Sequence, residues 1–199
     1  SVEITSCGIR PAIGNSVKTA LFSHLGKGIT ITADKIVLNS PQYSIFSGRG
    51  KDKKFEVTLD AQNIDITGTI WGYNGDIIIT PRTEGEVNIS APAQREDSIS
   101  LSAGSKLTIN EESAELKKMQ ISGKIDVSGE GTSLRANMTG DSSISPREGS
   151  TSTVAIEASN GGRVELNMSG ANSSILGDVK TGTGQNASIT ANLSGGSSR

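Results

Sequence analysis

The sequence predicts an all-β protein built as a β-solenoid, in which short strands stack in successive coils around a narrow core. Three observations support this fold class. Hydrophobic and polar residues alternate with a period of two in many short runs, and turn-forming Gly, Asn, Asp, Ser and Pro separate these runs. One short pattern also recurs at intervals of 30 and 25 residues. Recurrence at this period favours stacked coils over a sandwich or a barrel.

The composition agrees with a thin aliphatic core and excludes several classes of protein. Of the 199 residues, about two fifths are Gly, Ser, Thr or Asn, and only 3% are aromatic. The net charge of −2, with both signs interspersed, lacks the basic footprint of a nucleic-acid binder. A single cysteine, Cys7, and a single histidine, His24, predict no disulfide within the chain, no metal site and no cofactor. No apolar run is long enough to span a membrane.

The alternating runs place one hydrophobic face and one polar face on each expected strand. In chain order they cover residues 29–33, 57–61, 64–67, 87–91, 99–103, 107–109, 154–158 and 164–168. Two further segments, residues 15–25 and 111–118, have apolar or charged spacing that suggests short helices. The second of these is equally consistent with a charged loop.

The internal repeat has the pattern x-Asn-Φ-Ser/Thr-Gly, where Φ is hydrophobic, followed by small polar residues. Its clear members have Φ at Met138, Met168 and Leu193. Weaker members are expected at Leu59, Ile89 and Ile109. A unit of roughly 20 to 30 residues with two or three short strands is the size of one coil of a parallel β-helix. Unequal spacing then places the length variation in the turns.

The chain divides into two regions. All six aromatic residues lie within the first 73 positions, so residues 1–55 are expected to form an N-terminal cap with irregular first coils. Residues 56–199 are expected to form the β-helix coils. Because the sequence stops in the middle of a repeat unit, we expect a truncated last coil with an unpaired strand edge.

A family resemblance rests on residues 164–180 and 185–195. In the first run, a polar alternating strand (Val-Glu-Leu-Asn-Met) leads to a small-residue turn (Ser-Gly-Ala-Asn-Ser-Ser) and a Gly-Asp-Val segment; the second run repeats the strand as Ala-Ser-Ile-Thr-Ala-Asn-Leu. This alternation resembles passenger domains of Gram-negative autotransporters and extends over residues 64–199. The resemblance implies a right-handed, single-stranded parallel β-helix, exported and displayed or released at the cell surface. It further implies a full-length protein anchored through a C-terminal outer-membrane barrel.

Two sets of residues are candidates for contact with a host glycan, a host protein or a second copy of the chain. Trp71 and Tyr73 lie in a turn-like segment, residues 70–75, and are the best candidates for exposed aromatic side chains. The basic segment between two phenylalanines is expected to form a protruding loop that could meet acidic glycans or lipids. Its cationic residues are Arg49, Lys51, Lys53 and Lys54.

The candidates for catalysis are weaker. Ser142 follows Gly140-Asp141, as in a serine-protease loop, but the equivalent repeats at residues 170–174 and 195–198 make this a generic turn, and His24 is the only available base. Carboxylates arrayed on one face could serve a polysaccharide lyase or hydrolase, although outward strand positions are also where solvated charges belong. These residues are Asp60, Asp65, Asp76, Glu84 and Glu86, with Lys35 or Arg82 as partners.

Six Asn-x-Ser/Thr triplets begin at Asn88, Asn137, Asn167, Asn172, Asn186 and Asn192. Four of them (88, 137, 167 and 192) flank a Φ position, which predicts outward asparagines stacked between coils without glycosylation. The sequence thus favours a non-catalytic, surface-displayed or secreted adhesin or structural rod. A carbohydrate-active enzyme on the same fold and a trimeric phage fibre segment remain the alternatives.

Overall fold

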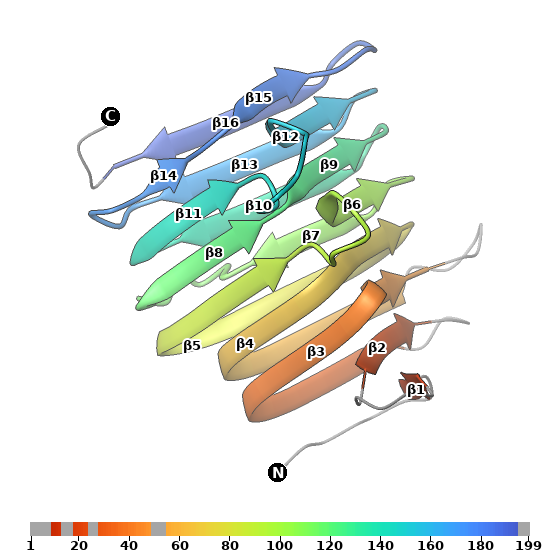
Figure 1. Ribbon diagram of the computed structural model, residues 1–199, viewed down its shortest axis with the longest axis vertical. Helices are drawn as coiled ribbons and strands as arrows, with labels where there is room; N and C mark the ends of the chain where they lie inside the picture. Colours follow the sequence, from red (N-terminus) through yellow and green to blue (C-terminus); the bar gives the residue numbers. More distant parts are fainter. Residues whose placement is uncertain (1–8, 13–17, 24–27, 49–54, 195–199) are drawn as a thin grey trace.

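The computed structural model describes residues 9–12, 18–23, 28–48 and 55–194, and every regular element within these ranges is a β-strand. The chain winds into a parallel β-helix of about six turns, seen in Figure 1 as ribbons stacked from the N-terminal to the C-terminal end. The predicted all-β solenoid is therefore confirmed. Equivalent segments of successive turns pair in parallel and form three sheets around one core.

The long strands of the first turns each bend through more than one sheet. β3 (Ile29–Ser47) and β4 (Phe55–Tyr73) contribute to all three sheets, and β5 (Gly75–Ser90) contributes to the first two. The first sheet continues with β7 (Lys106–Ile109), β10 (Ser133–Met138), β13 (Arg163–Met168) and β16 (Ser188–Leu193). The second continues with β8 (Lys118–Ser122), β11 (Asp141–Ser145) and β14 (Ser174–Ile175). The third continues with β6 (Asp97–Ser102), β9 (Lys124–Ser128), β12 (Val154–Ser159) and β15 (Asp178–Thr181).

The N-terminal elements are strands as well. β2 (Lys18–Ser23) pairs in parallel with the end of β3, and β1 (Ile9–Ala12) pairs with β2 in the antiparallel sense. The helix expected over residues 15–25 is thus wrong for residues 18–23; the rest of that segment lies outside the described residues. Sheet pairing with β3 overrides a weak helical spacing, because propensity is only a small energetic preference. Residues 111–117 form a loop before β8. The predicted helix is therefore wrong for this second segment, and the alternative prediction of a charged loop is confirmed.

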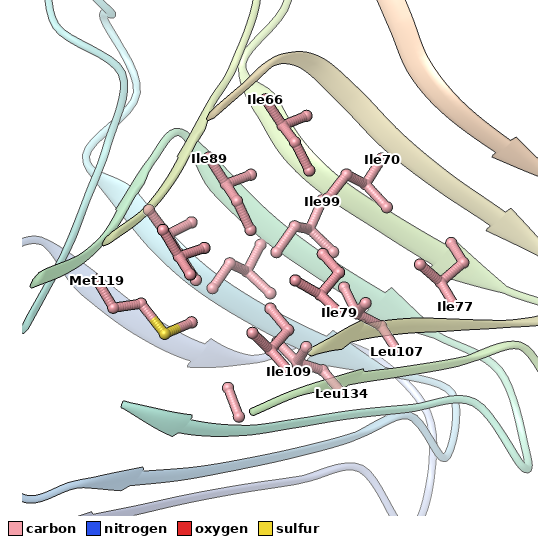
Figure 2. Close-up of a cluster of buried hydrophobic side chains, with 14 of the residues drawn as sticks. Ile66, Ile70, Ile77, Ile79, Ile89, Ile99, Leu107, Ile109, Met119 and Leu134 are labelled. Carbon is pink, nitrogen blue, oxygen red and sulfur yellow. The ribbon is translucent and has the colours of Figure 1, made fainter. Parts of the chain in front are cut away.

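The core is a set of aliphatic columns that run along the solenoid axis. In the third sheet, one column consists of Ile45, Ile70, Ile99, Ile125 and Ile156, each essentially inaccessible to solvent. Figure 2 shows how isoleucine and leucine side chains from different sheets point into this shared interior. Since most strands bury every second residue, the period of two read from the sequence is the spacing that fills the core.

Stacked asparagines form a second type of column, on the outer side of the first sheet. The Asn192 Nδ2 donates to Asn167 Oδ1 and the Asn167 Nδ2 donates to Asn137 Oδ1, both at 2.9 Å. The Asn137 Nδ2 in turn donates to the backbone carbonyl of Asn110 at 3.0 Å. This confirms the predicted stacking for three of the four asparagines. Asn88 lies instead in the second sheet, where its Nδ2 donates to Asp65 Oδ1 at 2.8 Å.

The pairing register shows that the weaker members of the predicted repeat do not share a column with its clear members. Met138, Met168 and Leu193 occupy one column, as predicted. Leu59 and Ile109 belong to a neighbouring column, two residues earlier along the strand, and Ile89 lies in the second sheet. Short Val-x-Ile or Leu-x-Ile runs occur in every sheet of this fold, so such a run does not say to which sheet it belongs.

The last described turn carries exposed apolar side chains. Leu176, Val179 and Leu193 are 59%, 48% and 48% exposed, whereas the residues that pair with the last two in the previous turn, Ile156 and Met168, are fully buried. The difference follows from stacking, because each coil is buried by its neighbours on both sides.

Candidate functional site

A group of four aromatic side chains lies on the outer side of the third sheet. Trp71 points outward because its neighbours Ile70 and Gly72 are buried, and it pairs in register with Phe46 of the preceding turn. The centroid of the Trp71 ring lies 4.4 Å from Phe46, 5.4 Å from Tyr43 and 6.2 Å from Tyr73. These spacings are those of favourable tilted aromatic pairs. We call Tyr43, Phe46, Trp71 and Tyr73 the aromatic surface.

One end of the aromatic surface is held by a cation–π contact, and the other end is exposed to solvent. The Arg95 guanidinium lies 4.2 Å from the centroid of the Tyr43 ring, a cation–π contact that fixes this end of the group. Tyr73 is 42% exposed, and Trp71 is half-buried against its neighbours. Backbone pairing of β3 with β4 sets the spacing between Phe46 and Trp71.

The predicted location of Trp71 and Tyr73 in a turn is wrong, because both residues lie in strand β4. Trp-Gly-Tyr alternates large and small residues with a period of two, and aromatic residues favour strands. Gly72 is closely packed: a Cβ atom there would lie 2.8 Å from the Leu101 Cδ2 atom and 2.9 Å from the Ser105 Oγ atom, so these side chains would have to shift. The turn begins only after Tyr73.

The same face of the third sheet continues into a charged cluster. The column that starts with Phe46 and Trp71 proceeds through Ser100 to Asp126, Glu157 and Lys180. Beside it, the Lys124 Nζ lies 2.6 Å from Glu157 Oε2 and 3.8 Å from Asp126 Oδ1. Asp97 pairs in register with Lys124. We call Asp97, Lys124, Asp126 and Glu157 the carboxylate–lysine cluster.

The cluster perturbs the protonation of its own members. Burial raises the pKa of Asp97 and of Asp126 above the ordinary carboxyl value, and it outweighs the attraction of the Lys124 ammonium. Burial alone would lower the pKa of Lys124, but the hydrogen bond to Glu157 and the charges of Asp126, Glu157 and Asp97 raise it. Two carboxyl groups with raised pKa values thus share a surface with an ammonium group whose pKa is also raised.

Asp126→Asn is expected to raise the free energy of unfolding at neutral pH. Because the folded state raises the pKa of Asp126, it binds the proton more tightly than the unfolded chain does, and stability falls as the pH rises from the ordinary carboxyl pKa through the raised value. Asparagine has no ionisable carboxyl group, so the variant does not lose this stability as the pH rises. The gain should stay below about 1 kcal/mol, since the carboxyl group is only half-buried. Urea unfolding at about pH 7 and about pH 3 measures it; the gain should vanish at the lower pH.

Asp178→Asn is the control of opposite sign. The hydrogen bond from Thr153 Oγ1 to Asp178 Oδ2 (2.7 Å) and the nearby Lys180 ammonium hold the pKa of Asp178 below its usual value. This group stabilises the fold above the ordinary carboxyl pKa and loses that contribution as the pH falls. The variant should therefore be less stable than the parent at neutral pH. Equal pH responses of the two variants would contradict the assignment.

The carboxylates proposed from sequence do not form one cluster. Asp60 accepts from Arg82 Nε at 2.9 Å, Asp65 lies 3.1 Å from Lys35 Nζ, and Glu84 lies 3.9 Å from Lys117 Nζ. Asp60 and Asp76 belong to the first sheet, and Asp65 and Glu86 to the second. Sequence reasoning missed the carboxylate–lysine cluster, because its members come from three strands that are about 30 residues apart and only the register aligns them.

Other candidates from the sequence have simpler structural explanations. Ser142 is buried in strand β11, so its predicted location in a turn is wrong. Its hydroxyl donates to the carbonyls of Thr139 and Gly140 at 3.2 and 3.1 Å and so closes the turn that precedes this strand. Cys7, His24 and the basic residues Arg49, Lys51, Lys53 and Lys54 lie outside the described residues. Over the described ranges there is no group of three or more His, Cys, Asp or Glu placed to hold a metal ion. The same ranges contain no helix long and apolar enough to cross a membrane.

No family model, curated protein or solved structure matches this chain. Its class is therefore defined by the fold: it is a parallel β-solenoid. One outer face of this solenoid carries the aromatic surface in the early turns and the carboxylate–lysine cluster in the later ones.

Proposed function

We propose that this chain is a non-catalytic binding rod, exposed at the surface of a Gram-negative bacterium or secreted by it, and that it contacts a host glycan or protein through the aromatic surface. The observation that carries the proposal is the exposure of Tyr73 beside the partly exposed Trp71 on one sheet face. The resemblance of residues 64–199 to autotransporter passenger repeats supports export and display. The full-length protein is then anchored through an outer-membrane barrel.

The physical basis of binding is stacking on preorganised rings. Aromatic side chains offer large apolar area while losing few rotatable bonds on binding. Here the ring spacing is set by the parallel pairing of β3 and β4 before any ligand binds. The apolar face of a sugar ring or an aromatic group of a protein could pack on Trp71 and Tyr73. Ser100 and Ser102, the register partners of these residues in β6, supply hydroxyl groups next to them.

Trp71 is the only tryptophan of the chain, so its fluorescence reports directly on this surface. Soluble neutral oligosaccharides and host extracellular-matrix proteins, titrated one at a time, should include at least one that shifts the Trp71 emission. Tyr73→Ala should weaken that binding roughly tenfold, the effect of losing one aromatic contact of an interface. Val37→Ala is the matched control, because Val37 is also exposed (55%) but lies on the second sheet.

Two outcomes would contradict the proposal. Absence of any emission shift across the panel would leave the aromatic surface without a ligand. Equal weakening by Tyr73→Ala and Val37→Ala would show that the contact lies elsewhere. Circular dichroism of both variants checks that the fold is retained.

A carbohydrate-active enzyme is the second candidate, and the carboxylate–lysine cluster favours it. A carboxyl group with a raised pKa can act as a general acid, and Glu157 and Lys124 lie beside Asp126. An activity screen against acidic and neutral polysaccharides tests this candidate. Turnover that is lost in both Asp126→Asn and Glu157→Gln would overturn the non-catalytic proposal.

A further inference from the structure

We propose that a second surface, the groove over the turns that lead from the third sheet to the first, binds an acidic polysaccharide. We call it the turn groove. It has a volume of about 950 Å³ and extends from the start of β7 over the turns that precede β10, β13 and β16. The groove therefore runs across successive coils, in the direction of the solenoid axis, as an extended chain ligand requires. It shares no residue with the aromatic surface, and the inference does not depend on the function proposed above.

Two basic residues, Lys106 and Arg163, lie at a fixed distance from each other along the turn groove. Lys106, Ser133 and Arg163 occupy one column of the first sheet, so the two basic residues are separated by two inter-strand steps, about 10 Å. This is the length scale of a disaccharide unit. Across the described part of the chain, neither Lys106 nor Arg163 forms an ion pair, and both side chains are exposed. Their charges are available to an anionic ligand.

The lining between the cations suits a hydroxylated ligand. Hydroxyl groups of Ser133 and Ser188 and side-chain amides of Asn160, Gln185 and Asn186 line the groove. Such groups donate to and accept from sugar hydroxyls. Ala187 is the only apolar side chain in the lining. A peptide, whose affinity comes largely from apolar anchors in pockets, has little to bury here.

The groove is also preorganised by bonds between coils. The Thr132 hydroxyl accepts from the backbone N–H of Gly104 at 2.9 Å, which links two of the turns. The Asn160 N–H donates to the carbonyl of Thr183 at 3.0 Å, which links the next pair. Rigid walls reduce the entropy lost on binding. Glu130 is the one anionic residue in the lining. Its negative charge repels an acidic ligand, so removal of this charge should strengthen binding.

The test uses the full chain and four defined polymers: dextran sulfate, polygalacturonate, polyglutamate and unmodified dextran. We expect both acidic polysaccharides, or one of them, to bind in isothermal titration calorimetry, and unmodified dextran not to bind. Lys106→Gln and Arg163→Gln should each weaken binding roughly fivefold, as expected for the loss of one charge-assisted contact. Glu130→Gln should strengthen binding. The affinity should fall as salt is added.

The controls separate this site from general charge effects. Lys117→Gln removes the same charge from an exposed lysine at a different corner, where Lys117 faces Glu84, and should leave binding unchanged. Equal weakening by Lys117→Gln, or no weakening by either groove variant, would overturn the proposal. Equally tight binding of polyglutamate or of unmodified dextran would also overturn it. Tyr73→Ala should not affect the acidic polymers, so failure of the aromatic surface as a binding site and failure of the turn groove are distinguishable.

Discussion

Gly140→Ala is expected to destabilise the β-helix by roughly 4 kcal/mol, within the range of severe single substitutions. Gly140 has a φ of 70°, and a Cβ atom there would lie 2.0 Å from the backbone carbonyl oxygen of Leu116 in the previous coil. Backbone cannot move aside as a side-chain tip can, so the two coils must separate locally. Its counterpart in the next repeat, Gly170, would meet the carbonyl oxygen of Gly140 at 1.5 Å. Urea unfolding followed by far-UV circular dichroism measures the loss.

Gly149→Ala is the matched control for this prediction. Gly149 has nearly the same φ, 74°, but no atom lies within 4 Å of the position of an added Cβ. Its substitution carries only the cost of a left-handed backbone, about 1 kcal/mol. The difference between the two variants therefore isolates the stacking of coils from backbone strain. Equal destabilisation by the two variants would contradict the inference that close contact between coils requires glycine at position 140.

Ile99→Ala is expected to cost roughly 2–5 kcal/mol of unfolding free energy, the range for large-to-small changes in a packed core. Ile99 is fully buried in the third-sheet column, between Ile70 of the preceding coil and Ile125 of the following one. Its removal leaves a cavity that touches both neighbouring coils. Because each coil of a solenoid is stabilised mainly by its neighbours, the damage should reach the turns on either side. Trp71 fluorescence reports on the preceding coil, and circular dichroism reports on the whole chain.

Val179→Ala tests the same column at its exposed end. Val179 pairs with Ile156 but is 48% exposed, so its truncation should cost less than about 0.5 kcal/mol. A similar loss in the two variants would argue that position in the column does not decide the energy. An Ile99→Ala variant as stable as the parent would argue against a close-packed core in this part of the sheet.

Much of the fold could be predicted from the sequence because one local rule generates it. Each strand buries alternate residues, so Val57, Leu59 and Ala61 are buried as the alternation predicts. The repeat glycines and asparagines could also be recognised in the sequence, since their contacts recur in the later coils. The expected helix over residues 15–25 was wrong where it is described, because β2 gains its stability from pairing with β3.

The candidate site was only partly predictable. Trp71 and Tyr73 could be singled out as rare residues in an aromatic-poor chain, although their placement in a turn was wrong. Asp126 and Glu157 gave no signal, since outward charged residues are common in every strand. Their meeting depends on turn lengths: β9 and β12 are joined by a coil whose length aligns Asp126 with Glu157.

The sequence by itself thus determined the class of fold, the aliphatic nature of the core and the recurrence of Asn and Gly in each late coil, because these follow from side-chain alternation within a few residues. Only the tertiary structure decided which residues share a column. It places Phe46, Trp71, Asp126 and Glu157 on one face, and Lys106 and Arg163 over one groove. The physical reason is that the register between coils is set by backbone hydrogen bonds and by the lengths of all the loops in one coil. A shift of one residue would move a side chain to the opposite face of its sheet.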